Sequence, residues 1–247
     1  MTEWIKGRVT ANRRWNAQLC SLQIQAPLPP FEAGQFVRLG LEVDGELLAR
    51  PYSLVNPPGT SEAEIYFNLV PGGPLSHRLF NLRPGEPLQL SARAAGFFTL
   101  AEVPAAKHLW LLATGTGIGP YLSMLRTPAP WQRFERIILV HGVKRADDLA
   151  YSKLRDRWRR ERPNQLCQLN AVTTEPSAGD LPCRITQALT SGLLEDRAGL
   201  QLQPQDSQVM LCGNPTMVAD CLEALTAKGL HKNLRRKPGE ITREVYQ

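Results

Sequence analysis

The sequence has no run of apolar residues long enough to cross a membrane, and its first residues, Met1–Lys6, lack the apolar core of a secretory signal. It also shows no internal repeat and no low-complexity tract. We therefore expect a cytoplasmic protein that does not associate with a membrane. At 247 residues the chain exceeds one ordinary domain, which favours two domains with separate cores.

Cysteine is scarce. The five cysteines form no C-x-x-C pair, which argues against a disulfide framework, a zinc site or an iron–sulfur cluster held by this chain. His141 follows an apolar run without a second histidine or carboxylate at a metal-binding spacing, so we interpret it as structural. No Ser/His/Asp arrangement indicates hydrolysis, and we expect no metal centre.

The net charge of +6 is unevenly distributed. Through Glu102 the chain has nine basic and nine acidic residues, whereas the remainder has 20 basic and 14 acidic residues. A positive field of this kind suits an anionic cofactor, an acidic protein partner or a nucleic acid.

Two clusters contribute much of this basic excess. One falls on a predicted helix, where a solvated surface is the simpler interpretation: Lys153, Arg155, Arg157, Arg159, Arg160 and Arg162. The other is tighter and suits either contact with an acidic protein or a solvated edge strand: Lys232, Arg235, Arg236 and Lys237.

The N-terminal half has the pattern of short strands joined by turns. Polar and apolar residues alternate over Leu19–Gln25, and Asp44-Gly45 predicts a tight hairpin between a strand over Gln35–Val43 and a strand ending near Ser53. Further strands are predicted over Glu64–Val70 and Pro87–Arg93. This pattern favours a small antiparallel barrel.

The pattern changes after Glu102-Val103-Pro104, where apolar strands alternate with helices. The predicted strands are His108–Ala113, Ile137–Val140, Leu166–Val172 and Gln208–Leu211, and the predicted helices are Gly119–Arg126, Asp147–Arg160, Pro182–Thr190 and Pro215–Lys228. Such alternation predicts a parallel sheet covered on both faces, with ligands at the carboxyl ends of its strands.

Arg50-Pro51-Tyr52-Ser53 combines a cation, an aromatic face and a hydroxyl at the end of a predicted strand. Arginine can bind a diphosphate through paired hydrogen bonds, tyrosine can stack on a flat heterocycle, and serine can hydrogen-bond a ring nitrogen. Taken alone, the stretch is better explained as a strand end with a surface arginine and a half-buried tyrosine.

Three further stretches place glycine before a helix. Gly72–Ser76 suits either a phosphate-binding turn or a plain hairpin loop, and Thr114–Pro120 suits either a nucleotide-binding loop or a strand-to-helix turn. The spacing in Thr114–Pro120 is G-x-G-x-G, so it is not the dinucleotide fingerprint. Cys212–Pro215 also follows an apolar strand, and its cysteine either meets a ligand or is a small buried residue.

These stretches, in this order and together with Ala33–Phe36, Ala94–Phe98 and His231–Gly239, resemble the ferredoxin (flavodoxin)–NADP reductase family, especially its bacterial members, nearly from end to end. The resemblance implies an α/β two-domain protein. Residues 1–103 would form an antiparallel β-barrel that binds FAD. Residues 104–247 would form a parallel, Rossmann-like domain that binds NADP(H), with a C-terminal tail that returns to the flavin.

The resemblance also implies the FAD contacts. Arg50 would meet the diphosphate, Tyr52 would stack on the isoalloxazine ring, and Ser53 would hydrogen-bond near its N5 atom. The complete FAD set is Arg50, Pro51, Tyr52, Ser53, Tyr66, Asn68, Val70, Gly73, Pro74, Leu75, Ser76, Thr116, Tyr246 and Gln247. Relatives end in an aromatic residue that covers the adenine, whereas here Tyr246 precedes a terminal Gln247.

The NADP(H) set implied by the resemblance is Val143, Lys144, Arg145, Thr173, Thr174, Arg184, Asn214, Pro215, Thr216 and Asp220. Cys212 would pack beside the nicotinamide and, with Tyr52 and Ser53, complete the catalytic set. Thr174 and Lys144 stand where close relatives have arginines for the 2′-phosphate, so the cationic clamp is thinner, although Arg145 and Arg184 still supply charge.

The resemblance implies a monomeric enzyme that moves a hydride between NADP(H) and FAD and exchanges single electrons with an acidic ferredoxin or flavodoxin. It implies no nucleic-acid partner. The alternatives are an NADH-dependent flavin reductase, an oxygenase reductase component, or a nucleotide- or nucleic-acid-binding module. The last would leave Arg50–Ser53 without a role.

Overall fold

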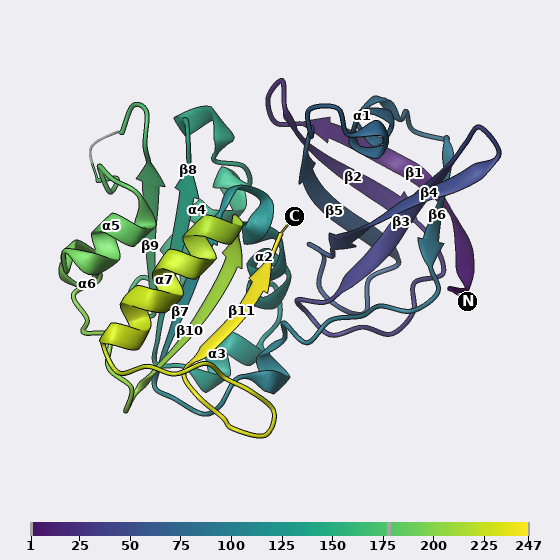
Figure 1. The fold of residues 1–247 in the computed structure, drawn as a ribbon. Coiled ribbons are helices and arrows are strands. Elements are labelled where there is room, and N and C mark those ends of the chain that lie inside the picture. Colours follow the sequence, from purple (N-terminus) through teal and green to yellow (C-terminus); the bar gives the residue numbers. More distant parts are fainter. Residues whose placement is uncertain (1, 177–178, 247) are drawn as a thin grey trace. The chain divides into compact units, whose positions relative to one another are not determined.

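The computed structural model describes residues 2–176 and 179–246. The chain forms two compact units: the barrel unit, Met1–Thr99 with Gly119–Thr127, and the parallel-sheet unit, Leu100–Ile118 with Pro128–Gln247. Each unit has its own sheet (Figure 1). Each also has its own apolar core. In the described part of the chain, no helix is long and apolar enough to cross a membrane.

The barrel unit contains a six-stranded antiparallel sheet in the order β4-β3-β6-β1-β2-β5. Its strands are β1 (Trp4–Arg14), β2 (Leu19–Gln25), β3 (Phe36–Val43), β4 (Glu46–Ser53), β5 (Glu62–Asn68) and β6 (Pro87–Ser91). The two outer strands approach each other where Leu54 pairs with Ile65 and Val55 N donates to Glu64 O at 2.8 Å. This contact curls the sheet into the predicted barrel.

The Asp44-Gly45 turn confirms the predicted hairpin. Both residues have positive φ, 52° and 83°, and Val43 pairs with Glu46 across the turn. Turns of this hand match the twist of the strands they join, and glycine adopts them without steric cost. The signal is local, which explains why the sequence predicted it correctly.

Strand β1 escaped prediction because its pattern is interrupted. Its register with β2 shifts between Val9 and Ala11, which moves side chains between faces and breaks the alternation. Gly7 is buried where an added Cβ would lie 2.5 Å from Leu90 and 2.8 Å from Ile24. Close packing of the barrel therefore requires a residue without a side chain inside this strand.

Helices α1 (Pro74–Asn81) and α2 (Gly119–Leu125) complete the barrel unit. Leu75 and Leu79 of α1 join the barrel core. Helix α2 comes later in the chain, yet Ser123 Oγ donates to Asn56 O at 2.7 Å, and Arg126, directly after α2, pairs with Glu64 at 2.6 Å.

The parallel-sheet unit contains five parallel strands in the order β11-β10-β7-β8-β9, which confirms the predicted fold class. The strands are β7 (His108–Thr114), β8 (Arg136–Val143), β9 (Leu166–Val172), β10 (Ser207–Gly213) and β11 (Ile241–Val245). The helices are α3 (Ala129–Arg133), α4 (Ser152–Glu161), α5 (Ile185–Thr190), α6 (Leu193–Ala198) and α7 (Pro215–Ala227), with 3₁₀ turns η1 (Leu100–Glu102), η2 (Gly115–Ile118) and η3 (Ala146–Asp148).

Helices cover both faces of this sheet. Residues of α5, α6 and α7 share a core with alternate strand residues such as Trp110, Leu112 and Leu169. Helix α4 contacts the opposite side of β9, where Gln168 and Asn170 project. The carboxyl ends of β7, β8, β9 and β10 remain together at one edge.

Two helices begin later than predicted. Helix α4 starts at Ser152 rather than Asp147, because residues 146–148 form a separate 3₁₀ turn and Tyr151 has a left-handed φ of 58°. Helix α5 starts at Ile185 rather than Pro182. The short helices α3 and α6 were not predicted, since each spans fewer than two turns and has little periodicity to detect.

Candidate active site

Arg50 lies on β4 with an exposed guanidinium group. Its Nη1 donates to Ala49 O at 2.8 Å, and within the described ranges it forms no ion pair with a carboxylate. Side chains two residues apart project from the same face of a strand, so Arg50 and Tyr52 share a face. The strand thus offers a cation and an aromatic ring side by side.

Tyr52 is half-buried, and its ring meets the ring of Phe67 edge-on with a centroid distance of 5.7 Å and an interplanar angle of 71°. Burial raises the pKa of Tyr52 to about 12, against the opposing effect of the Arg50 charge. The phenol is therefore neutral at physiological pH. The edge-on contact with Phe67 orients the Tyr52 ring.

Ser53 ends β4 opposite Phe36, which pairs on its other side with Ala95. The serine is half-buried, so its hydroxyl lies at the rim of the sheet. The next residue, Leu54, donates its amide to Gln35 O at 3.0 Å. Two of the stretches that carried the family resemblance, Ala33–Phe36 and Ala94–Phe98, therefore lie beside Arg50–Ser53.

The predicted ligand-facing wall on β5 is divided. Asn68 is exposed, and Val70 is 46% exposed, which is high for a valine, but Tyr66 is buried at 5%. The strand itself ends at Asn68 rather than at Val70. Asn68 and Val70 thus remain accessible, whereas the Tyr66 side chain contributes mainly to the core.

The glycine turn before α1 exposes backbone amides. Gly72 has a left-handed φ of 69°, and an added Cβ on Gly73 would lie 2.9 Å from Val70 Cβ. Pro74 occupies the first helical turn, where the amides of Leu75 and Ser76 have no carbonyl partner within the helix. This end of α1 therefore suits an anion.

The Ser76 hydroxyl is used within the turn. It accepts from Val70 N at 3.1 Å and donates to Gly73 O at 3.2 Å, and the residue is buried. What the turn can offer an anion is thus main-chain N–H groups rather than this hydroxyl. Helix α1 contacts β4, the strand that carries Arg50.

The donor set of the barrel unit therefore fits FAD. A cation and free helix amides match a diphosphate, and the fixed Tyr52 ring matches the flavin plane. Gln247, also expected to contact FAD, lies outside the described residues.

In the parallel-sheet unit, the loop after β7 is pinned between two strands. Gly117 packs so closely on β10 that an added Cβ would lie 2.5 Å from Cys212 O. On the other side, Gly115 O lies 2.9 Å from His141 Nε2 of β8. Thr116, half-buried, sits between these two fixed glycines.

The start of α7 is organised by Asn214. Its Oδ1 accepts from Thr216 N at 2.9 Å and Met217 N at 3.4 Å, and its own amide donates to Thr114 Oγ1 at 3.0 Å. Pro215 occupies the first helical turn. Asn214, Pro215, Thr216 and Asp220 are all exposed at this end of the helix or one turn on, so the predicted residues are accessible.

Cys212 is completely buried in β10. Burial and the neighbouring Glu244 carboxylate raise the pKa of its thiol well above the usual value, although a hydrogen bond with Tyr246 opposes this. The thiol is therefore protonated and is no nucleophile. Tyr246 N also donates to Gly213 O at 3.0 Å, so this predicted FAD residue is tied to β10 within its own unit.

The segments that carry the predicted NADP(H) residues lie beside one another at the carboxyl ends of β8 and β9. Thr173 N donates to Val143 O at 3.2 Å, and Thr174 N donates to Lys144 O at 3.0 Å. Arg184 precedes Ile185, whose Cδ1 lies 2.9 Å from the position of a Cβ added to Gly142. Lys144, Arg145, Thr174 and Arg184 are exposed, whereas Val143 contributes only its backbone. This cluster suits an anionic ligand.

One residue of the basic helix was interpreted wrongly. Arg155 is not solvated but 5% exposed, and its guanidinium donates to Asn170 Oδ1 at 2.6 Å and Gln168 Oε1 at 3.3 Å. The other five basic residues of the run are exposed, as predicted. Tyr151 and Trp158, buried four residues before and three after, place Arg155 on the inward face of α4, a spacing visible in the sequence.

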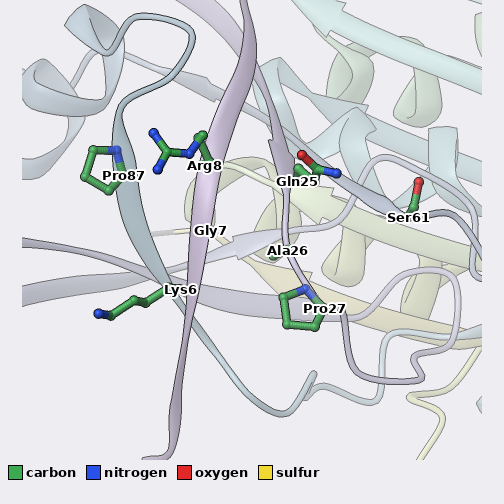
Figure 2. A pocket seen from close by; sticks show the side chains of 8 residues that line it. All are labelled: Lys6, Gly7, Arg8, Gln25, Ala26, Pro27, Ser61 and Pro87. Atoms are coloured by element: carbon green, nitrogen blue, oxygen red, sulfur yellow. The ribbon is translucent and has the colours of Figure 1, made fainter.

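A shallow groove of about 520 Å³ lies elsewhere on the barrel unit. Figure 2 shows Lys6 and Arg8 of β1 along it, with Gln25 of β2, Ser61 and Pro87 of β6 at its sides. Arg8 Nη1 donates to Gly85 O. None of the lining residues belongs to the predicted cofactor sets.

Comparison with known families matches both halves of the chain. Residues 12–97 match the oxidoreductase FAD-binding domain, and residues 111–223 match the oxidoreductase NAD-binding domain. These ranges contain most of the candidate residues described above.

Individual relatives match over the whole length. The flavodoxin/ferredoxin–NADP reductase of Escherichia coli is 45% identical, with 100% of each chain covered. The ferredoxin–NADP reductase of Azotobacter vinelandii is 34% identical over 94% of this chain and 93% of its own. The crystal structure of a ferredoxin NADP⁺ reductase from Neisseria gonorrhoeae, with bound FAD and NADP, superposes with a TM-score of 0.93 at 28% identity, covering 99% of both chains.

Proposed function

Because the chain belongs to the flavodoxin/ferredoxin–NADP reductase family, we propose that it transfers a hydride between NADP(H) and bound FAD and exchanges single electrons with a flavodoxin or a ferredoxin. It is an FAD-dependent oxidoreductase. When bound, FAD supplies the conversion between a two-electron hydride and single electrons. The protein supplies binding, orientation and electrostatics.

The barrel residues divide the work of holding FAD. Arg50 and the first amides of α1 bind the diphosphate, and Tyr52, held edge-on by Phe67, stacks on the flavin ring. Ser53 hydrogen-bonds near N5, and the exposed Asn68 and Val70 line the same wall. The combination of an exposed arginine with a fixed aromatic ring, next to a helix with free amides, is the observation that carries this assignment.

The parallel-sheet residues divide the work of holding NADP(H). Lys144, Arg145 and Arg184 bind the phosphate groups, and the exposed start of α7 binds the nucleotide with Asn214 as its cap. Thr116 lies near the nicotinamide. Cys212 supports that site by packing under it as a neutral thiol. Functionally, residues 1–103 bind FAD and residues 104–247 bind NADP(H), and Tyr246 is the aromatic residue proposed for the adenine of FAD.

The carrier is an acidic protein that binds by charge attraction. The basic excess lies in the C-terminal half of the chain, and complementary charge speeds association of such partners. The enzyme works as a cytoplasmic monomer.

A visible absorption spectrum of the purified protein is the first test. A yellow protein that NADPH bleaches supports the assignment, whereas a colourless protein favours a nucleotide- or nucleic-acid-binding module.

The second test compares two acceptors at increasing salt. Activity with the carrier should fall steeply because charge attraction is screened, while reduction of a small uncharged artificial acceptor by NADPH should fall little. Equal salt dependence of both activities contradicts electrostatic docking.

An NADH-dependent flavin reductase is the second candidate, because Thr174 and the adjacent Glu175 offer no cation to a 2′-phosphate. Comparable efficiency with NADH and NADPH would favour it, or an oxygenase reductase component.

A further inference from the structure

His141 reaches from one strand to the loop that follows the neighbouring strand. In the sheet it pairs with Ala113, near the end of β7, and its Nε2 lies 2.9 Å from Gly115 O. The side chain is fully buried. Among the residues that the structure describes, His141 provides the side-chain hydrogen bond to the Gly115 carbonyl oxygen.

The loop itself has little freedom on its other side. Gly117 is pressed against the backbone of Cys212 and Gly213, where an added Cβ would lie 2.5 Å and 2.9 Å from backbone atoms. Gly115 has a left-handed φ of 54°, a conformation that permits a change of chain direction. The place of Thr116 is therefore set by a backbone contact at Gly117 and a side-chain hydrogen bond at Gly115.

The chemistry of the contact fixes the form of the imidazole. A carbonyl oxygen can only accept, so Nε2 carries the hydrogen. Burial, with the nearby Arg155 charge, lowers the pKa of His141 to about 3, so the ring is neutral and Nδ1 is a bare acceptor. In the part of the chain that the structure describes, Nδ1 is buried and has no hydrogen-bond partner.

An unpaired buried acceptor opposes folding. An apolar side chain of similar size would fill this space without that cost, so packing alone does not account for a histidine here. What the histidine supplies, and an apolar residue cannot, is the N–H group on Gly115 O.

We infer that His141 is a positioning residue for hydride transfer, which holds the Gly115 carbonyl and thereby sets the place of Thr116 at the nicotinamide. The inference rests on the proposed function. His141 touches neither substrate nor cofactor, and its role is exerted through the loop.

Three variants separate this role from packing. His141→Gln places an amide N–H where Nε2 lies, whereas His141→Met fills similar space without a donor. Val140→Ala, one residue before on the opposite face of β8, is a matched core control. Stopped-flow flavin reduction by NADPH should slow roughly tenfold in His141→Met, and stay within about threefold of the parent in His141→Gln and Val140→Ala. FAD content should be equal in all four proteins.

Binding provides a readout without turnover. NADP⁺ contains the nicotinamide, whereas 2′-phospho-AMP lacks it. His141→Met should weaken NADP⁺ binding more than 2′-phospho-AMP binding. Equal weakening of both ligands, or equal rates in His141→Met and the parent, overturns the inference.

The tautomer is a further check. Nitrogen-15 NMR of the parent should place the imidazole hydrogen on Nε2, and a hydrogen on Nδ1 overturns the inference. If the parent itself is not reduced by NADPH, the proposed function fails. If the parent is reduced and the variants are indistinguishable from it, only the role of His141 fails.

Discussion

The amide nitrogen of Thr174 donates a hydrogen bond of 3.0 Å to the carbonyl oxygen of Lys144. This bond extends the pairing of β8 and β9 beyond the sheet, so residue 174 is fixed beside an exposed lysine. A cationic side chain at position 174 would therefore be close enough to bind the same ligand as Lys144.

Thr174→Arg should raise the preference for NADPH over NADH by roughly tenfold or more, because a charge-assisted hydrogen bond to a phosphate contributes about 1.5–3 kcal/mol. The ratio of kcat/KM values for the two nucleotides measures it. Arg184→Gln should lower the same ratio. A ratio that is insensitive to both changes would place the 2′-phosphate elsewhere.

Ser53→Ala should slow flavin reduction roughly tenfold or more while FAD stays bound, since a donor near N5 acts on the reaction more than on retention. Stopped-flow rates and FAD content measure the two effects. If the variant loses FAD, but the molecules that keep it are reduced at the parent rate, Ser53 acts in FAD binding rather than in the reaction.

Cys212 should resist iodoacetamide in the folded protein at pH 8, because burial and Glu244 hold the thiol protonated. Mass spectrometry of the native and urea-unfolded protein measures the modification. Cys183, half-exposed near the start of α5, should react first and is the internal control. Rapid native labelling of Cys212 would contradict a closed packing of β10 against β11.

His141 should make the protein less stable in acid. Its pKa falls from 6.5 in the unfolded chain to about 3 in the folded protein, through burial and the charge of Arg155. Between these values only the unfolded chain binds the proton. The contribution of His141 to the free energy of unfolding is thus complete above pH 6.5. It decreases as the pH falls below this value, by at most about 1.4 kcal/mol per pH unit. Urea unfolding of the parent and His141→Gln from pH 7 to pH 5 should give a shallower slope for the variant, and equal slopes would contradict a neutral buried ring.

Lys228→Met should destabilise the parallel-sheet unit by about 1–2 kcal/mol, because it leaves the buried Glu195 carboxylate without its cation. Lys228 Nζ lies 2.5 Å from Glu195 Oε2, and Leu202 N donates to Oε1 at 2.8 Å. The exposed pair Arg157–Glu161 is the control, and Arg157→Met should change the unfolding free energy by less than about 0.5 kcal/mol. Similar losses in both variants would mean that burial of Glu195 adds nothing to the pair.

The parts of the fold that the sequence predicted correctly depend on neighbours in the chain. Leu19–Gln25 alternates along its own length, and Asp44-Gly45 determines its turn through its own backbone. Strand β1 could not be found this way, because its register shift near Val9 and the close packing at Gly7 depend on strands far along the chain. The burial of Arg155 likewise depends on Asn170, which lies on another element.

The candidate site shows the same division. The order of the motifs indicated the family, and the accessible residues Arg50, Asn68 and Lys144 lie where ligands can reach them. The sequence could not show that the Ser76 hydroxyl and the Asn214 amide oxygen are used to build their own helix starts. Nor could it show that His141 meets Gly115, since this contact exists only once β7 and β8 are paired.

Helix α2 has a practical consequence for dissecting the gene. Its side chains belong to the barrel unit, where Ser123 bonds to Asn56, and Arg126 just beyond it pairs with Glu64. A fragment that stops after residue 103 would lack helix α2 and expose apolar surface to water, so we expect it to aggregate. A chimera that exchanges the barrel with that of a relative should carry Gly119–Thr127 along with it, as a second, separate exchange.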